Sequence, residues 1–150
     1  MENLPSYARD TKHILNIIND IEWEEGIMLV TLDVTSLYTF ITHENGLLAL
    51  RTFVYKRPAE LIKHTHMVVD MARLIMDINV FLFNGKWYQQ LCGVAMGYRF
   101  ASSYGNLFIG WFEAVHVWGP ASVEWTDFIL YWGYFIDDIL MIWMGSEDAL

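Results

Sequence analysis

The chain is poor in cysteine and in basic residues. Its single cysteine, Cys92, excludes a disulfide bond within the chain and a zinc site built from several cysteines, and we expect it to be a small buried residue. The chain has nine Lys and Arg and 18 Asp and Glu, which gives a net charge of −9. Because contacts to phosphate need Lys and Arg, this balance argues against autonomous nucleic-acid binding.

The sequence also lacks a long uninterrupted apolar run. Its most apolar stretch, residues 128–144, carries Asp137 and Asp138 at its centre, where each charge disfavours membrane insertion by roughly 3 kcal/mol. The N-terminus has neither the basic nor the apolar region of a signal peptide. The five His lack the spacing of an H-E-x-x-H zinc site, so we assign none of them a metal. We therefore expect an intracellular protein without a membrane span.

Apolar residues are abundant instead. Hydrophobic residues make up 55% of the chain and aromatic residues 16%, and the mean hydropathy is +0.27. A domain of this length can bury a core, but this composition predicts large exposed apolar patches of the kind that partner surfaces cover. The chain is expected to be a piece of something larger.

The spacing of apolar residues predicts an α+β fold. We expect helices over residues 9–21, 42–57, 58–78 and 101–117. A strand buried on both faces is expected over residues 27–34, a type I′ hairpin at Asn84-Gly85, a loop over residues 93–97, and two strands over residues 128–144. This order predicts helices covering one face of a mostly antiparallel sheet.

Asp137 and Asp138 are the most informative residues, because they lie between two apolar, aromatic-rich runs. A buried unpaired charge costs several kcal/mol or more unless it is neutralised, paired or bound to a metal. If the strand that carries Asp33 lies beside this hairpin, three carboxylates meet at one end of the sheet. Oxygen ligands without His or Cys favour Mg²⁺ or Mn²⁺, and two such ions catalyse in-line phosphoryl displacement.

Three segments occur in the order of reverse transcriptase motifs A, B and C. They are Leu32-Asp33-Val34-Thr35-Ser36-Leu37-Tyr38-Thr39, the segment from Gly93 to Phe108, and Phe135-Ile136-Asp137-Asp138. Over roughly residues 4–147 the chain resembles the palm of a reverse transcriptase, an RNA-directed DNA polymerase, and it is most similar to the enzymes of Penelope-like retroelements. The resemblance implies a palm-like antiparallel sheet covered by helices. Residues 1–150 would form a partial reverse transcriptase domain without complete fingers and thumb.

The resemblance also implies a catalytic site. It makes Asp33 and Asp137 the principal metal ligands, Asp138 the adjacent carboxylate of the catalytic set, and Mg²⁺ or Mn²⁺ the cofactor. Tyr38 matches the aromatic residue that stacks under the incoming sugar and excludes a ribose 2′-hydroxyl. The implied partners are an RNA template, a DNA primer and dNTPs, with the missing fingers and thumb or another protein covering the apolar surface. An active retroelement enzyme would work in the nucleus.

In reverse transcriptases, a loop and the start of the helix after it follow the template and the nucleotide. The resemblance places Gly97, Arg99, Phe100 and Ala101 at these positions. Taken without the resemblance, Tyr38 is a core tyrosine at a strand end, and Gly97 is a turn residue with positive φ. Gln89 and Gln90 precede this loop, and we expect them to support the hairpin and not to contact a template.

Some residues depart from the family pattern and keep other interpretations open. Related sequences usually have Asn-Ile-Pro at Phe40-Ile41-Thr42, Pro at Ser102, Ala at Gly105 and Arg-Tyr at Tyr134-Phe135. A second hypothesis is a catalytically inactive retroelement relic or protein-interaction module. A third is an α+β domain with an incidental Asp-Asp turn, which a separation of more than about 10 Å between Asp33 and Asp137 would favour.

Overall fold

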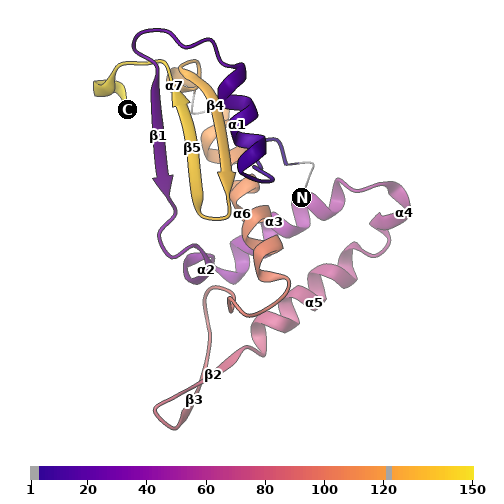
Figure 1. Cartoon of the computed structure of the whole chain (residues 1–150). Coiled ribbons are helices and arrows are strands. Elements are labelled where there is room, and N and C mark those ends of the chain that lie inside the picture. The colour runs from indigo at the N-terminus through magenta and orange to yellow at the C-terminus, as the bar shows by residue number, and fades with distance from the viewer. Residues whose placement is uncertain (1–3, 121–122) are drawn as a thin grey trace. The chain divides into compact units, whose positions relative to one another are not determined.

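The computed structural model describes residues 4–120 and 123–150 and is a mixed α+β structure with small antiparallel sheets (Figure 1). Its elements are α1 (Thr11–Asp20), β1 (Met28–Asp33), α2 (Leu37–Phe40), α3 (His43–Tyr55), α4 (Ala59–Ile62), α5 (Thr65–Asp77), β2 (Val80–Phe83), β3 (Lys86–Gln89), α6 (Ala101–Phe112), η1 (Glu113–Val117), α7 (Val123–Thr126), β4 (Ile129–Phe135), β5 (Asp138–Trp143) and η3 (Glu147–Ala149). In the described part of the chain, no helix is both long and apolar enough to cross a membrane.

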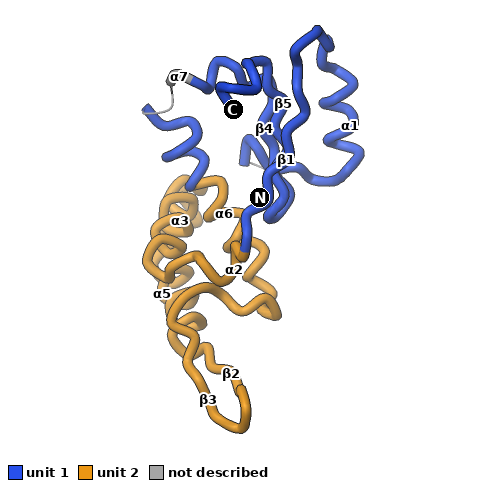
Figure 2. The backbone as a smooth tube through the Cα atoms, turned by 90° about the vertical axis from the view of Figure 1, so that its left-hand side faces the viewer, with its two compact units in different colours: residues 1–35, 112–150 blue, residues 36–111 orange. Residues whose placement is uncertain are grey.

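The chain divides into two compact units (Figure 2). The first combines Met1–Thr35 with Phe112–Leu150, and the second is Ser36–Trp111. The predicted α+β class is confirmed, but the strands form two separate sheets, one in each unit, and not one layer.

A three-stranded antiparallel sheet in the order β1-β5-β4 forms the centre of the first unit (Figure 1). The central strand β5 supplies much of the core, with Met141, Ile142 and Trp143 all buried. The predicted strand pair over residues 128–144 is confirmed. The N-terminal segment extends the sheet by one isolated parallel bridge, from Tyr7 to Tyr134 on the outer edge of β4.

The expected helix over residues 9–21 is confirmed as α1, which Asp10 caps by accepting a hydrogen bond from the His13 N–H at 2.8 Å. Ile14 of α1 lines a cavity together with Leu140. On β4, Trp132 faces the other side of the sheet and donates a hydrogen bond to Glu113 of η1. The expectation that helices cover one face is therefore wrong for this sheet.

Strand β1 forms where predicted, but the prediction that both of its faces are buried is wrong. Leu29 is 54% exposed and Leu32 is 42% exposed. The physical reason is the strand order, because β1 has one strand neighbour and lies at the edge of the sheet, while β5 has two. A continuous apolar run therefore does not separate an edge strand from a central one.

The helices of the second unit follow local signals with one exception. Helix α3 forms where predicted, and Thr42 caps it by accepting a hydrogen bond from the Asn45 N–H at 3.2 Å. The single long helix expected over residues 58–78 is wrong, since a turn at Lys63-His64 separates α4 from α5. Helix α5 begins at Thr65, which is buried. His66 of α5 contacts Tyr55 at the end of α3.

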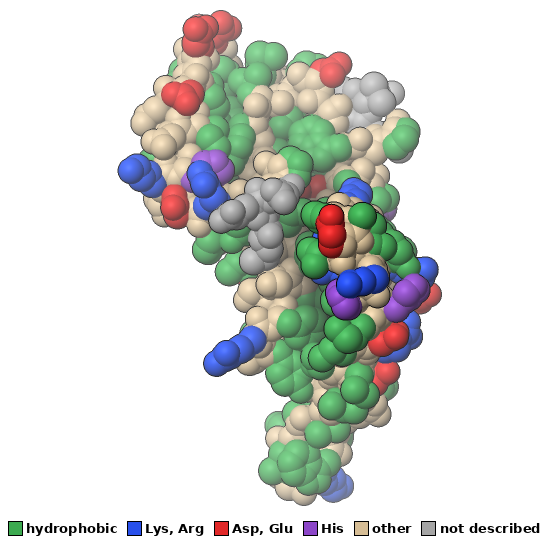
Figure 3. Space-filling view, turned by 90° about the vertical axis from the view of Figure 1, so that its right-hand side faces the viewer, with side chains coloured by type: hydrophobic (Ala, Val, Ile, Leu, Met, Phe, Trp, Pro, Cys, Tyr) green, Lys and Arg blue, Asp and Glu red, His purple; other side chains and the backbone are tan. Residues whose placement is uncertain are grey.

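The second sheet is the predicted hairpin of β2 and β3. Asn84 and Gly85 have φ values of +48° and +73°, as a type I′ turn requires. All residues of both strands are exposed, with Phe83 at 67% and Trp87 at 71%, and Figure 3 shows apolar side chains gathered over this hairpin at the lower end of the view. The expected excess of exposed apolar surface is confirmed here.

The loop after the hairpin and the helix after the loop also form as expected, with two differences. Cys92 is exposed and not buried, because it lies in the loop, where its Sγ is 3.8 Å from the carbonyl oxygens of Phe40 and Ile41. The helix expected over residues 101–117 is α-helical to Phe112 and then continues as the π-helix η1. Its first π-helical residue is Glu113.

Candidate active site

Asp33 and Asp138 are directly opposite one another in the β1–β5 ladder. Asp33 is the last residue of β1 and Asp138 is the first residue of β5, so both lie at one end of the sheet. The Val34 N–H donates to the Asp137 carbonyl oxygen at 2.9 Å and holds the chain after β1 beside the turn. The strand that carries Asp33 is thus a neighbour of the Asp137-Asp138 hairpin, as the metal-site hypothesis requires.

Asp137 lies in the two-residue turn Ile136-Asp137, because Phe135 and Asp138 form the last pair of the β4–β5 hairpin. Ile136 has a φ of +59°. Positive φ at the first turn residue is typical of a type II′ turn, where glycine is the usual residue. A β-branched residue there is strained, and such strain persists where surrounding structure enforces it, often at functional sites. The sequence gives no sign of this strain, because a β-branched residue such as Ile136 is typical of strands.

The donor chemistry of the three aspartates fits Mg²⁺ or Mn²⁺, because carboxylate oxygens are the ligands these ions prefer. Asp33 and Asp138 are exposed and Asp137 is half-buried, so water and ions reach all three. Within residues 4–120 and 123–150, no three His, Cys, Asp or Glu side chains are grouped so that they could hold an ion. The backbone thus brings the donors to one end of the sheet without gathering their side chains around one point.

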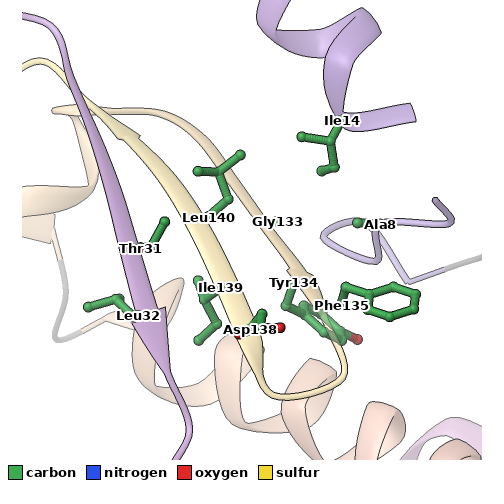
Figure 4. A pocket seen from close by; sticks show the side chains of 10 residues that line it. All are labelled: Ala8, Ile14, Thr31, Leu32, Gly133, Tyr134, Phe135, Asp138, Ile139 and Leu140. Atoms are coloured by element: carbon green, nitrogen blue, oxygen red, sulfur yellow. The ribbon is translucent and has the colours of Figure 1, made fainter. Parts of the chain in front are cut away.

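A cavity of about 260 Å³ lies beside Asp138 in the first unit (Figure 4). Asp138 is the charged residue of its lining, with the Phe135 ring and Ala8 from the N-terminal segment nearby (Figure 4). The rest is mostly apolar, namely Ile14, Thr31, Leu32, Gly133, Tyr134, Ile139 and Leu140. The cavity can therefore hold an apolar or aromatic group next to a carboxylate.

Tyr134 stands where the reverse transcriptase pattern has arginine, and its packing gives a physical reason for the difference. Its side chain is 1% exposed and its ring meets Tyr7 edge-on, with 6.0 Å between ring centroids. Burial raises the pKa of this phenol, with smaller contributions from Glu113 and Tyr7. An arginine here would be a buried charge, so tyrosine suits this packing.

Tyr38 belongs to α2 in the second unit and is half-buried. A Cβ added at Gly105 would lie 3.2 Å from Tyr38 Cε1 and 3.6 Å from Leu37 Cδ2. Glycine in place of the alanine of the reverse transcriptase pattern thus gives the Tyr38 ring room against α6. Phe40, another departure from the reverse transcriptase pattern, is 72% exposed.

The predicted substrate-binding loop also lies in the second unit. Gly97 is exposed, with open space where a Cβ would be, and its φ is not positive, so the interpretation of Gly97 as a positive-φ turn is wrong. Arg99 is exposed, and Phe100 packs against Tyr104 with 5.4 Å between ring centroids. Ala101 is 1% exposed at the start of α6, where it has a packing role.

Gln89 and Gln90 support the base of the hairpin, as expected. Gln89 Nε2 donates to the Asp77 carbonyl oxygen at 2.7 Å. Gln90 Oε1 accepts from Asn79 Nδ2 at 2.6 Å, and its Nε2 donates to the Cys92 carbonyl oxygen at 2.8 Å. These bonds use both amides within the second unit.

No family model matches the chain, and no curated protein matches it. The resemblance to reverse transcriptases therefore depends on the three ordered motifs.

Proposed function

We propose that the chain carries the palm of an RNA-directed DNA polymerase, which transfers deoxynucleotides from dNTPs to a primer 3′-hydroxyl on an RNA template. The single observation that carries this proposal is the pairing of Asp33 with Asp138 at the end of the sheet, with Asp137 in the adjoining turn. Packing alone gives no reason for three carboxylates at one sheet end, since like charges at paired positions destabilise a sheet. A bound cation gives such a reason, because it offsets the repulsion between the carboxylates.

The carboxylates would hold Mg²⁺ or Mn²⁺. Bound there, these ions would activate the primer hydroxyl and stabilise the charge on the leaving pyrophosphate. Asp33 and Asp137 act as the principal ligands in this proposal and Asp138 as the adjacent carboxylate. The strained turn at Ile136 keeps Asp137 at the tip of the hairpin, where a primer end and a nucleotide have access.

The proposal assigns the contacts with template and nucleotide to residues of the second unit. Except for Arg9 and Lys12, every Lys and Arg of the chain lies within Ser36–Trp111. The net negative charge of the chain therefore belongs to the unit with the carboxylates, while the unit with Arg99 carries the basic residues that phosphate contacts need. In the proposal, Tyr38 stacks under the incoming sugar, Gly97, Arg99 and Phe100 follow template and nucleotide, and Ala101 supports this helix start by packing.

A primer-extension assay tests the proposal. The expressed chain is incubated with an RNA template, a labelled DNA primer, dNTPs and Mg²⁺ or Mn²⁺. We expect extension that Asp137→Ala abolishes and that Asp148→Ala, which changes an exposed aspartate outside the sheet, leaves intact. Absence of extension at every protein and metal concentration would contradict the proposal for this chain.

A second candidate is a catalytically inactive relic or protein-interaction module, and the exposed β2–β3 hairpin favours it. Phe83 and Trp87 expose aromatic surface that a water-facing strand seldom carries. The flanking coding sequence discriminates between the candidates. A reading frame that continues into thumb sequence and a GIY-YIG endonuclease domain would favour a mobile-element enzyme, and a short intact gene would favour the relic.

A further inference from the structure

Glu113 is a buried carboxyl group that the proposed catalytic site does not use. It is 4% exposed and is the first residue of the π-helix η1. Its carboxylate accepts hydrogen bonds from the indole N–H of Trp132 on β4 and from the hydroxyl of Ser6 in the N-terminal segment. One carboxyl group thus connects a helix, a strand and the N-terminal segment within the first unit.

The surroundings of Glu113 disfavour its charged form. Burial raises its pKa to about 7, although the hydrogen bonds from Trp132 and Ser6 oppose this shift. On β4, the pKa values of the Tyr131 and Tyr134 phenols are raised by their burial first and by the charge of Glu113 second. Ionisation of Glu113 therefore places a poorly hydrated charge between these segments.

Two further ionisable groups lie near this cluster. Tyr7 of the N-terminal segment meets the ring of Tyr134. His116 is the basic residue in the last turn of η1, and its ring packs on Phe112 with 4.5 Å between centroids.

The N-terminal segment is the most weakly attached of the three parts that meet at Glu113. It is held to β4 by an isolated bridge, in which the Tyr134 N–H donates to the Ser6 carbonyl and the Ala8 N–H donates to the Tyr134 carbonyl, both at 2.8 Å. In contrast, β4 pairs with β5 along its length. A local opening that hydrates Glu113 will therefore break the bridge before the ladder.

We propose that protonated Glu113 fastens residues 6–8 to the outer edge of β4, and that ionisation of this carboxyl releases them, so that the edge opens as the pH rises. The released edge leads directly to the hairpin turn that carries Asp137. This inference does not depend on the proposed polymerase activity, because it concerns the attachment of the N-terminal segment alone.

Hydrogen exchange of the full chain tests the inference at the Ala8 and Tyr134 amides. Opening returns Glu113 from a pKa of about 7 to its ordinary value of 4.5. Protection factors, corrected for intrinsic exchange, should thus fall by up to about tenfold per pH unit between these two values and level off above the higher one. Protection factors at both amides that stay constant across this range would overturn the inference.

Two variants make the test specific. Glu113→Gln keeps the shape and hydrogen bonds of the protonated acid, so protection should stay high and independent of pH. Glu147→Gln removes an exposed carboxyl of η3 and should behave like the wild type. If Glu113→Gln does not fold, Trp132→Phe replaces it, since loss of a donor to the carboxylate should move the levelling pH upward. A pH dependence that survives Glu113→Gln unchanged, or a levelling pH that Trp132→Phe leaves in place, would contradict the role of Glu113.

Discussion

Asp33 and Asp138 are cross-strand partners at the open end of the β1–β5 ladder, one residue from the turn that holds Asp137. Directly opposed side chains of an antiparallel pair lie on the same face of the sheet. The pairing therefore sets two negative charges next to each other, which has a cost in the metal-free protein and, under the proposed function, a use in binding a metal ion.

Replacement of Asp33 by Asn should stabilise the metal-free protein. Removing one of two opposed charges is expected to raise the free energy of unfolding by roughly 0.2–1 kcal/mol, and high salt should shrink the gain. Urea unfolding with EDTA at low and high salt measures both effects. Asp148→Asn is the matched control and should change stability less. A loss of stability in Asp33→Asn would show that Asp33 has a favourable partner in the native state.

Substitutions at Gly85 and Gly97 should distinguish the energetic cost of backbone strain from that of steric crowding. Both have open space where a Cβ would be, but Gly85 alone of the two has positive φ, at +73°. Gly85→Ala should lower the free energy of unfolding by about 1 kcal/mol, whereas Gly97→Ala should change it by less than about 0.5 kcal/mol. Equal effects of the two substitutions in thermal or urea unfolding would contradict the hairpin geometry.

Tyr104 and Gly46 should be energetically coupled. A Cβ at Gly46 would overlap the Tyr104 hydroxyl, and that hydroxyl is buried without a hydrogen-bond partner among the described residues. We expect Gly46→Ala to cost about 1–3 kcal/mol of stability through overpacking. Tyr104→Phe should be neutral or stabilising, because it removes an unsatisfied hydroxyl. A double-mutant cycle should show rescue, and strictly additive effects would refute the contact.

The pH dependence of global stability should carry a contribution from Glu113. Its folded-state pKa of about 7 lies above the unfolded value of 4.5, so the native state binds the proton more tightly. The contribution is full below the lower value, falls as the pH rises and is lost above the higher one, for a total on the order of 3 kcal/mol. The difference in unfolding free energy between wild type and Glu113→Gln, measured across this range, isolates it. A difference that does not vary with pH would contradict the assignment.

Local sequence signals predicted much of the fold because they specify conformation without reference to distant residues. Asn84-Gly85 specified a turn with two positive φ values, and Thr42 specified the start of α3. Burial could not be predicted in the same way. β1 has the composition of a central strand and lies at an edge, since strand order depends on contacts between distant segments.

The candidate site was predicted in part. The three aspartates were chosen from the order of the motifs. Their position at one end of the sheet follows from the pairing of β1 with β5, which the sequence could only suggest. The strain at Ile136 and the burial of Glu113 were not predicted. Ile136 suits a strand and Glu113 suits a solvated helix face, so tertiary context overrides the local preference at both positions.

Binding of Mn²⁺ to the aspartates is the most direct measure of the central claim. Titration of the full chain with Mn²⁺, followed by the loss of the free-ion electron paramagnetic resonance signal, should show binding that weakens at least about tenfold in Asp33→Ala and Asp137→Ala. Asp148→Ala should bind like the wild type. Equal binding by all four proteins, or none by the wild type, would contradict a metal site at Asp33, Asp137 and Asp138.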